Sequence, residues 1–125
     1  MIKQKNNPLI KHSQTRKTVL ITFSDGQILK GPVGETIESF VQSRSFSSKL
    51  RPVACHVDGQ LRELTYPANQ DRHVRVLTLA NSDGRRVYRR SLSLLLVAAA
   101  HELFPEAKIL VDYGLNFGAL YCQVR

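Results

Sequence analysis

Two Asp-Gly pairs, each flanked by short apolar runs, constrain the fold of this chain more than any other feature. Asp-Gly is a strong signal for a tight hairpin turn, because both residues tolerate the positive φ angles that such a turn requires. The pairs are Asp25-Gly26, between Thr18–Phe23 and Ile28–Lys30, and Asp58-Gly59, between Val53–Val57 and Leu61–Leu64. The sequence therefore predicts two β-hairpins.

A short helix is predicted between the hairpins. Thr36 can accept a hydrogen bond from the first turn, and Ile37, Phe40 and Val41 recur at helical spacing. The pattern fades near Ser43, so we expect the helix to end there.

One more strand completes the predicted domain. His73–Leu79 alternates apolar and polar residues, as a half-buried strand does, and Gly31-Pro32 is expected to break the first hairpin. The resulting order is β-β-α-β-β-β. One helix laid across a mixed sheet of this length is the β-grasp, or ubiquitin-like, arrangement, an α+β fold.

A second unit follows the predicted β-grasp domain. Asn81–Gly84 reads as a turn or linker, and Tyr88–Phe104 has the periodicity of a long helix that Pro105 ends. Lys108–Val111 and Ala119–Val124 then read as the two strands of a hairpin. The predicted unit is a helix plus a β-hairpin.

The predicted long helix is apolar on more than one face. Leu94 and Val97 fall off the main apolar stripe, so the helix is expected to need cover from both sides. We therefore interpret Leu94 and Val97 as docking residues for a missing domain or another subunit. The main stripe consists of Leu92, Leu95, Leu96, Ala99 and Leu103.

Basic residues outnumber acidic ones by 18 to 10, which gives a net charge of +8 and favours polyanionic partners. Residues 1–16 carry several lysines and no acid, and their polar, aperiodic pattern predicts a flexible basic arm. A second cluster, Arg85, Arg86, Arg89 and Arg90, is a candidate site for RNA or nucleotide phosphate. The alternative for both segments is an ordinary solvated surface.

The cysteines and the apolar runs exclude several classes of protein. Cys55 and Cys122 are far apart and lack a C-x-x-C partner, so no disulfide scaffold or cysteine-rich zinc site is expected, and both should be buried. The longest apolar run, Leu94–Ala100, is far shorter than a membrane span. We expect no membrane partner and a cytoplasmic location.

Four motifs mark the segment Lys17–Leu79: Ile21–Gly26, Gly34–Thr36, Ala54–Gly59 and Val74–Leu79. With these motifs the segment resembles a TGS domain, the β-grasp module at the amino end of threonyl-tRNA synthetases. The same module occurs in stringent-response enzymes and some GTPases, so the resemblance implies a fold better than a function.

The predicted second unit resembles the start of the second additional domain of threonyl- and alanyl-tRNA synthetases, which hydrolyses mischarged tRNA. That family carries an H-x-x-x-H pair able to hold zinc, and aligning Glu102–Pro105 places the pair at Arg90 and Leu94. Arginine only donates hydrogen bonds and leucine has no lone pair, so neither can be a ligand. His101, near the helix end, is expected to be a surface residue. The resemblance thus implies no catalytic residue, no metal and no cofactor in this chain.

These resemblances divide the chain into three parts: a flexible basic arm (1–16), a TGS-like β-grasp domain (17–80) and a partial editing-like domain (81–125, with its helix at 88–104). Asp58 is expected to serve its turn, and Asp112 to finish a strand rather than act as a catalyst.

A third resemblance is to bacterial uridine-kinase-like nucleoside kinases, carried by Tyr88–Leu96, His101–Pro105 and Gly118–Cys122. Asp112–Gly114 departs from that pattern, and no G-x-x-x-x-G-K-[ST] loop is present to bind phosphates. We therefore expect a non-catalytic recognition or regulatory module of such a kinase, whose C-terminal kinase domain lies outside this chain. The alternative is a structural docking module of a threonyl-tRNA synthetase-like protein without editing activity. A surviving aminoacyl-tRNA hydrolase is the third hypothesis.

Overall fold

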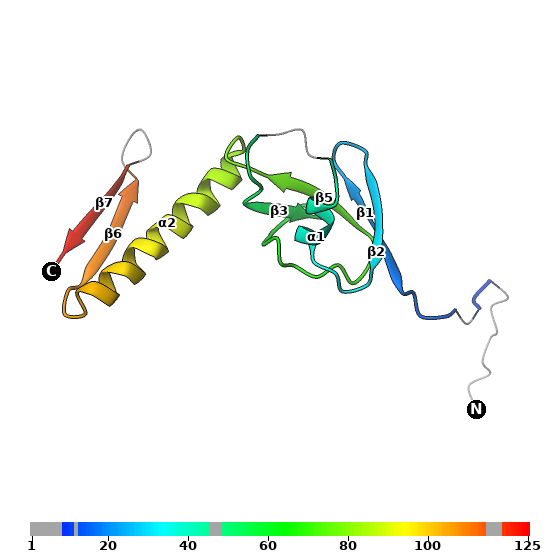
Figure 1. Cartoon of the computed structure of the whole chain (residues 1–125), viewed down its shortest axis with the longest axis horizontal. Coiled ribbons are helices and arrows are strands. Elements are labelled where there is room, and N and C mark those ends of the chain that lie inside the picture. Colours follow the sequence, from blue (N-terminus) through cyan, green and yellow to red (C-terminus); the bar gives the residue numbers. More distant parts are fainter. Residues whose placement is uncertain (1–8, 12, 46–48, 115–118) are drawn as a thin grey trace, which may run out of the picture.

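A computed structural model describes residues 9–11, 13–45, 49–114 and 119–125 of the chain. Figure 1 shows a small α+β domain from which a long helix, α2, extends, with a two-stranded hairpin beside the distal part of that helix. No helix in these ranges is long and apolar enough to cross a membrane.

The small domain has the predicted β-grasp architecture. Its five-stranded sheet has the order β2-β1-β5-β3-β4, in which β1 and β5 are parallel and the other neighbours are antiparallel. The α+β class is therefore confirmed. The elements are β1 (Thr18–Phe23), β2 (Ile28–Pro32), α1 (Ile37–Gln42), β3 (Ala54–Val57), β4 (Gln60–Arg62) and β5 (Arg72–Leu77).

Both predicted hairpin turns form, and their backbone angles explain the residues found there. Gly26 has φ +88° in the first turn, and Asp58 and Gly59 have φ 49° and 80° in the second. The Asp58 carboxylate also accepts hydrogen bonds from the backbone N–H of His73 (2.9 Å) and from Arg72 (2.8 Å). Asp58 thus has the structural role that its position predicts.

The core lies between the sheet and α1, where apolar residues alternate along the strands. Thr36 caps α1 by accepting a hydrogen bond from the Ser39 N–H (3.3 Å), and the helix ends at Gln42 with Ser43 as its C-cap, close to the predicted end. The largest fully buried side chains are Phe23, Ile21, Ile37, Leu77, Val19, Val74 and Cys55.

The expected break at Gly31-Pro32 is wrong, because β2 continues through Pro32. β2 is an edge strand, where proline's missing N–H costs no ladder hydrogen bond. Gly31 lies under the Phe40 ring, and a Cβ atom there would come 2.5 Å from the ring. Glycine at position 31 therefore allows the Phe40 ring to pack against β2.

The second unit consists of α2 (Ser82–Leu103), β6 (Ile109–Gly114) and β7 (Leu120–Val124), and β6 and β7 pair antiparallel. Its helix begins at Ser82 instead of Tyr88, so the expected linker at Asn81–Gly84 is wrong. Turn-forming residues occupy the N-cap and first turn of a helix equally well. Residues 115–118, between the two strands, lie outside the described residues.

The two cysteines occupy different environments. Both are free; Cys55 is buried, as predicted, whereas Cys122 on β7 is exposed, which contradicts the prediction for it. β7 has no buried residue, because α2 contacts β6 but does not bury β7. A cysteine is buried only where there is a core to bury it.

Part of the predicted arm contacts the β-grasp domain. Residues 1–8 and 12 lie outside the described residues, but Arg16 pairs with Asp71 through two hydrogen bonds of 2.9 and 3.0 Å. The Asp71 carboxylate also accepts a hydrogen bond from the Leu20 N–H (2.8 Å). Arg16 therefore lies against the domain.

Candidate functional site at the start of helix α2

Hydrogen bonds between side chains and backbone fix the turn that joins β5 to α2. The Asn81 side chain accepts a hydrogen bond from the Thr78 N–H (2.9 Å), and the Thr78 hydroxyl accepts one from the Ala80 N–H (3.2 Å). Nη1 of Arg85 donates to the carbonyl oxygens of Leu79 (3.1 Å) and Ala80 (3.0 Å). The first turn of α2 is therefore tied to the turn that precedes it.

Two further contacts connect the first turn of α2 with the β-grasp domain. Gly84 is the only buried residue of α2, and it packs against the backbone of Thr78. Nε2 of His56 on β3 lies 3.2 Å from a carboxylate oxygen of Asp83, an ion pair when the histidine is protonated. The start of α2 is thus held by packing, hydrogen bonds and charge.

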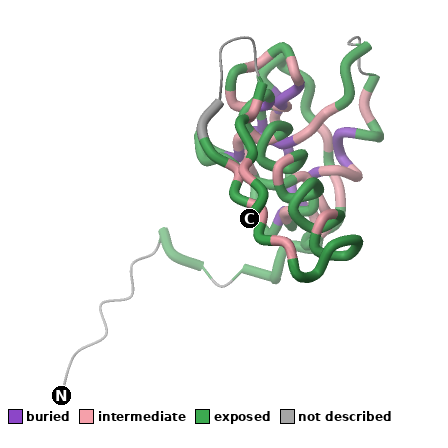
Figure 2. Tube along the Cα trace, turned by 90° about the vertical axis from the view of Figure 1, so that its left-hand side faces the viewer, coloured by how far each residue is buried: buried purple, intermediate pink, exposed green. Residues whose placement is uncertain are grey.

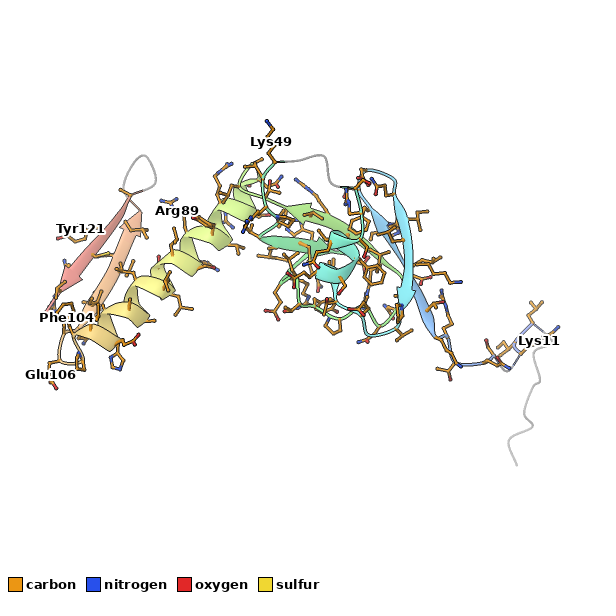
Figure 3. All side chains as sticks on the ribbon, viewed as in Figure 1. Lys11, Lys49, Arg89, Phe104, Glu106 and Tyr121 are labelled. Carbon is orange, nitrogen blue, oxygen red and sulfur yellow. The ribbon has the colours of Figure 1, made fainter. Side chains whose placement is uncertain are left out.

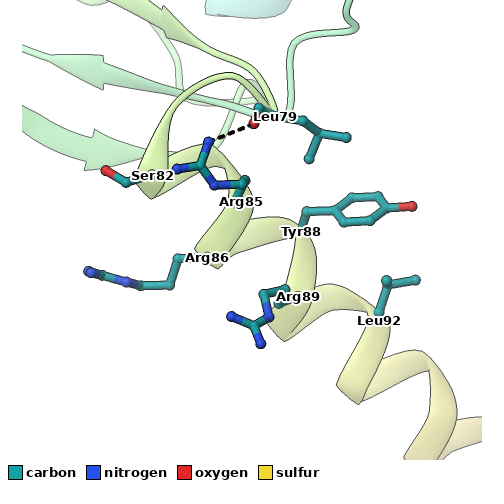
Figure 4. Close-up of a pocket in the computed structure, with 7 residues that line it drawn as sticks. All are labelled: Leu79, Ser82, Arg85, Arg86, Tyr88, Arg89 and Leu92. Carbon is teal, nitrogen blue, oxygen red and sulfur yellow. Dashed lines mark hydrogen bonds between the residues drawn. The ribbon is translucent and has the colours of Figure 1, made fainter. Parts of the chain in front are cut away.

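The start of α2 and the preceding turn surround an open hollow of about 740 Å³, which we call the arginine hollow. In Figure 4, the ring of Tyr88 points to the same side as Leu79 and Leu92, whereas Arg86 and Arg89 extend to the other side. The hollow therefore has one apolar and one cationic side. Its lining residues are Leu79, Ser82, Arg85, Arg86, Tyr88, Arg89 and Leu92.

The structure brings together three of the four arginines that the sequence singled out. Arg85, Arg86 and Arg89 line the hollow, but Arg90 does not. Successive helical residues are about 100° apart, so Arg85 and Arg89, at i and i+4, share a side that Arg90 leaves. This spacing separates Arg90 from Arg85 and Arg89 in advance, but not from Arg86, which lies four residues before Arg90.

The sequence prediction missed the apolar side of the hollow. Tyr88 and Leu92 were read as parts of a helix, and Leu79 as the end of a strand. Leu79 joins them because β5 ends at Leu77 and the chain turns at once into α2. A helix predicted to start at Ser82 instead of Tyr88 would have placed Leu79 close to this apolar side.

The distal part of α2 is apolar and largely exposed, although β6 contacts the helix. Figure 3 shows Phe104 at the end of the helix and Tyr121 on β7, and Figure 2 shows that exposed residues dominate this unit. The predicted docking residues Leu94 and Val97 are 71% and 37% exposed. Other exposed apolar residues of this unit are Leu92, Leu95, Leu96, Leu103, Phe104, Leu110, Tyr121 and Val124.

The positions expected for a metal pair do not suit a metal. Arg90 and Leu94 lie on α2, His101 is exposed in the last turn, and His56 contacts Asp83. Within the described ranges no group of three or more His, Cys, Asp or Glu side chains could hold an ion. The donor set of this helix therefore does not fit the zinc that the H-x-x-x-H pair of the editing family can hold.

Comparison with known proteins finds threonine–tRNA ligases among the relatives of this chain, whereas no family model matches it. A threonine–tRNA ligase from Desulforamulus reducens is 31% identical over 103 residues, which are 82% of this chain and 16% of that protein. A threonine–tRNA ligase from Symbiobacterium thermophilum is 33% identical over 103 residues, with the same shares, and one from Ligilactobacillus salivarius is 32% identical over 104 residues, which are 80% and 16%.

The comparisons give no support to the expected uridine-kinase-like relationship. The chain spans about a sixth of the length of the curated relatives it matches. Over about four fifths of its own length, the chain is similar to these threonine–tRNA ligases, which supports a domain of threonyl-tRNA synthetase type.

Proposed function

We propose that this chain is a non-catalytic docking module of a threonyl-tRNA synthetase-like protein. In this role the TGS-like β-grasp domain fixes the start of α2, and the distal part of α2 binds the remainder of that protein. The comparisons favour the synthetase-like alternative of the sequence analysis over its uridine-kinase-like reading, so the synthetase-like context is the one we propose.

The observation that carries the proposal is that α2 and its hairpin have no core of their own. α2 is 22 residues long, or roughly 33 Å, yet Gly84 is its only buried residue, and β7 has no buried residue at all. Helices in proteins owe most of their stability to packing of an apolar face. A helix of this length and composition is therefore expected to pack against further protein.

The apolar side chains of α2 lie on both sides of the helix, so both sides need to pack against other protein. Leu92, Leu96 and Leu103 fall within about 40° of one another around the helix, whereas Leu94 and Val97 lie on the other side. β6 and β7 form only two strands. Cover on both sides requires protein beyond this unit, and the much greater length of the relatives is consistent with such a source.

The proposal excludes editing chemistry on the same helix. The two positions that a metal-dependent editing site would use are Arg90 and Leu94, which cannot donate a lone pair to a metal. We infer that the helix keeps the architecture of an editing-type domain while serving association.

Substitutions in the native gene product that contains this chain test the docking role. Leu94→Asp should separate this module from the rest of the protein, seen as rapid proteolytic release of a fragment of this size, because a carboxylate cannot be buried unpaired. Leu61→Asp is the matched control, since Leu61 is a 46% exposed leucine on edge strand β4. Equal proteolysis of the two variants would refute the proposal. A dimer that Leu94→Asp dissociates would also refute it, because a second copy of the chain would then cover the helix.

A further inference from the structure

We propose that the arginine hollow binds a phosphorylated nucleotide, with the base on the ring of Tyr88 and the phosphate on Arg85 and Arg89. Single-stranded RNA and free nucleoside phosphates share this chemistry, and the experiment below separates them. The inference does not rest on the docking role, because neither Leu94 nor Val97 lines the hollow.

The cationic side of the hollow is organised for an anion. Nη1 of Arg85 is held by two backbone carbonyl oxygens, which fixes the plane of the guanidinium, and Nε and Nη2 carry three further donors. Arg89 is exposed and forms no ion pair within the described part of the chain. Guanidinium groups bind phosphate oxygens in pairs of parallel hydrogen bonds, so this arrangement suits a phosphate group.

The apolar side of the hollow suits a flat ring. Tyr88 is 43% exposed and Leu92 is 44% exposed, and Leu79 lines the same space. A base stacked on an aromatic side chain contributes about 1–3 kcal/mol in single-strand binding. Bases in a duplex are already stacked on their neighbours, so the accessible form is an unpaired nucleotide.

The size and charge of the hollow favour a nucleotide over an acidic peptide. Its volume of about 740 Å³ lies in the usual range for small-molecule sites. The net charge of +8 attracts polyanions over long range. An acidic peptide would satisfy the arginines but has no need of a flat ring beside them.

One carboxylate lies next to the cluster without lining the hollow. Asp83 is 3.8 Å from Arg86 and 3.2 Å from His56, so it is shared between two basic groups. Arg86 is therefore partly compensated, and we assign the main phosphate contacts to Arg85 and Arg89.

Fluorescence anisotropy with a labelled single-stranded RNA of about eight nucleotides tests the phosphate contacts. Arg89→Gln should weaken binding about tenfold and reduce the slope of log Kd against log salt by roughly 0.7, the value for one phosphate contact. Arg90→Gln removes the same charge from the next residue, outside the hollow, and should have little effect. Equal losses in the two variants would mean that charge alone binds RNA and would overturn the site.

The base contact is tested in the same assay. Tyr88→Ala should weaken binding about tenfold, whereas Tyr121→Ala, at a similarly exposed tyrosine on β7, should not. Competition by ATP or UTP would identify a free nucleotide as a ligand, and competition only by unlabelled strand would identify RNA. Absence of binding, equal binding of duplex RNA, or equal competition by polyglutamate would overturn the proposal. Leu94→Asp should leave RNA affinity unchanged, which keeps this result separate from the docking role.

Discussion

Gly84 of α2 lies directly against Thr78, so that a Cβ atom at position 84 would come within 2.0 Å of the Thr78 carbonyl oxygen. The contact is with backbone, so no side-chain rotation can relieve it. It sets how closely the first turn of α2 approaches the end of the β-grasp sheet, and therefore where the arginine hollow forms.

Gly84→Ala should destabilise this junction. Alanine favours a helix by about 1 kcal/mol over glycine, but overpacking against fixed backbone costs about 1–3 kcal/mol and should dominate here. We expect a lower urea midpoint and faster amide exchange in the first turn of α2. Ser82→Ala, at an exposed position of the same turn, is the control. A Gly84→Ala protein as stable as the parent would show that the close approach to Thr78 is unimportant.

The two cysteines should react with a thiol reagent at very different rates. Burial raises the pKa of the Cys55 thiol to about 11, whereas Cys122 is exposed. Ellman's reagent at pH 8 should therefore modify one thiol quickly and the other only as the domain opens. Cys122→Ser should remove the fast phase; if the fast phase persists, the burial of Cys55 is wrong.

The raised pKa of Cys55 also has a consequence for stability at high pH. The folded thiol stays protonated when the unfolded thiol, with its ordinary pKa near 9.0, has already lost its proton. Stability should therefore be unaffected below pH 9 and fall as the pH rises toward about 11. Cys55→Ala should reduce that fall relative to the parent, measured by urea unfolding, and an unchanged alkaline fall would argue against the assigned cause.

Acid should destabilise the β-grasp domain through two aspartates. The His73 N–H and Arg72 lower the pKa of Asp58, and the Leu20 N–H and Arg16 lower the pKa of Asp71. Lowered pKa values mean that the stabilisation is present above the ordinary aspartate value of 3.8 and is lost as pH falls below it. Urea midpoints between pH 6 and pH 2 should fall less in Asp58→Asn and Asp71→Asn than in the parent.

The control for the acid prediction is Glu106→Gln. Glu106 is exposed, and no hydrogen bond or ion pair of its side chain occurs in the described ranges. That variant should follow the parent at every pH. If it flattened the acid response as much as the aspartate variants, general charge repulsion would be the cause.

The sequence predicted the β-grasp domain well because its signals are local. These signals act within a few residues: the positive φ angles at Gly26 and Gly59, the alternation along the strands and the Thr36 cap. Gly84 failed as a signal because its role is tertiary: the same residue reads as a linker in sequence and as a close contact in space. The expected burial of Cys122 failed for a related reason, since period-2 alternation in a hairpin does not reveal whether another layer covers it.

In the candidate site, too, the sequence predicted what depends on one element and missed what depends on the fold. The four-residue spacing of Arg85 and Arg89 predicts a shared side of a helix, and the structure places both in the hollow. The contribution of Leu79 could not be read from the sequence, because it depends on the sharp turn between β5 and α2. Side chains on one element are related by its period, whereas those on two elements are related only by the fold.

Hydrogen exchange along residues 92–104 tests the central claim most directly. The measurement compares this chain alone with the native gene product that contains it. If the distal part of α2 is a docking surface, its amides should exchange at least about tenfold more slowly in the native gene product, while β1 and β5 exchange equally in both. Equal exchange of residues 92–104 in the two proteins would contradict the docking role.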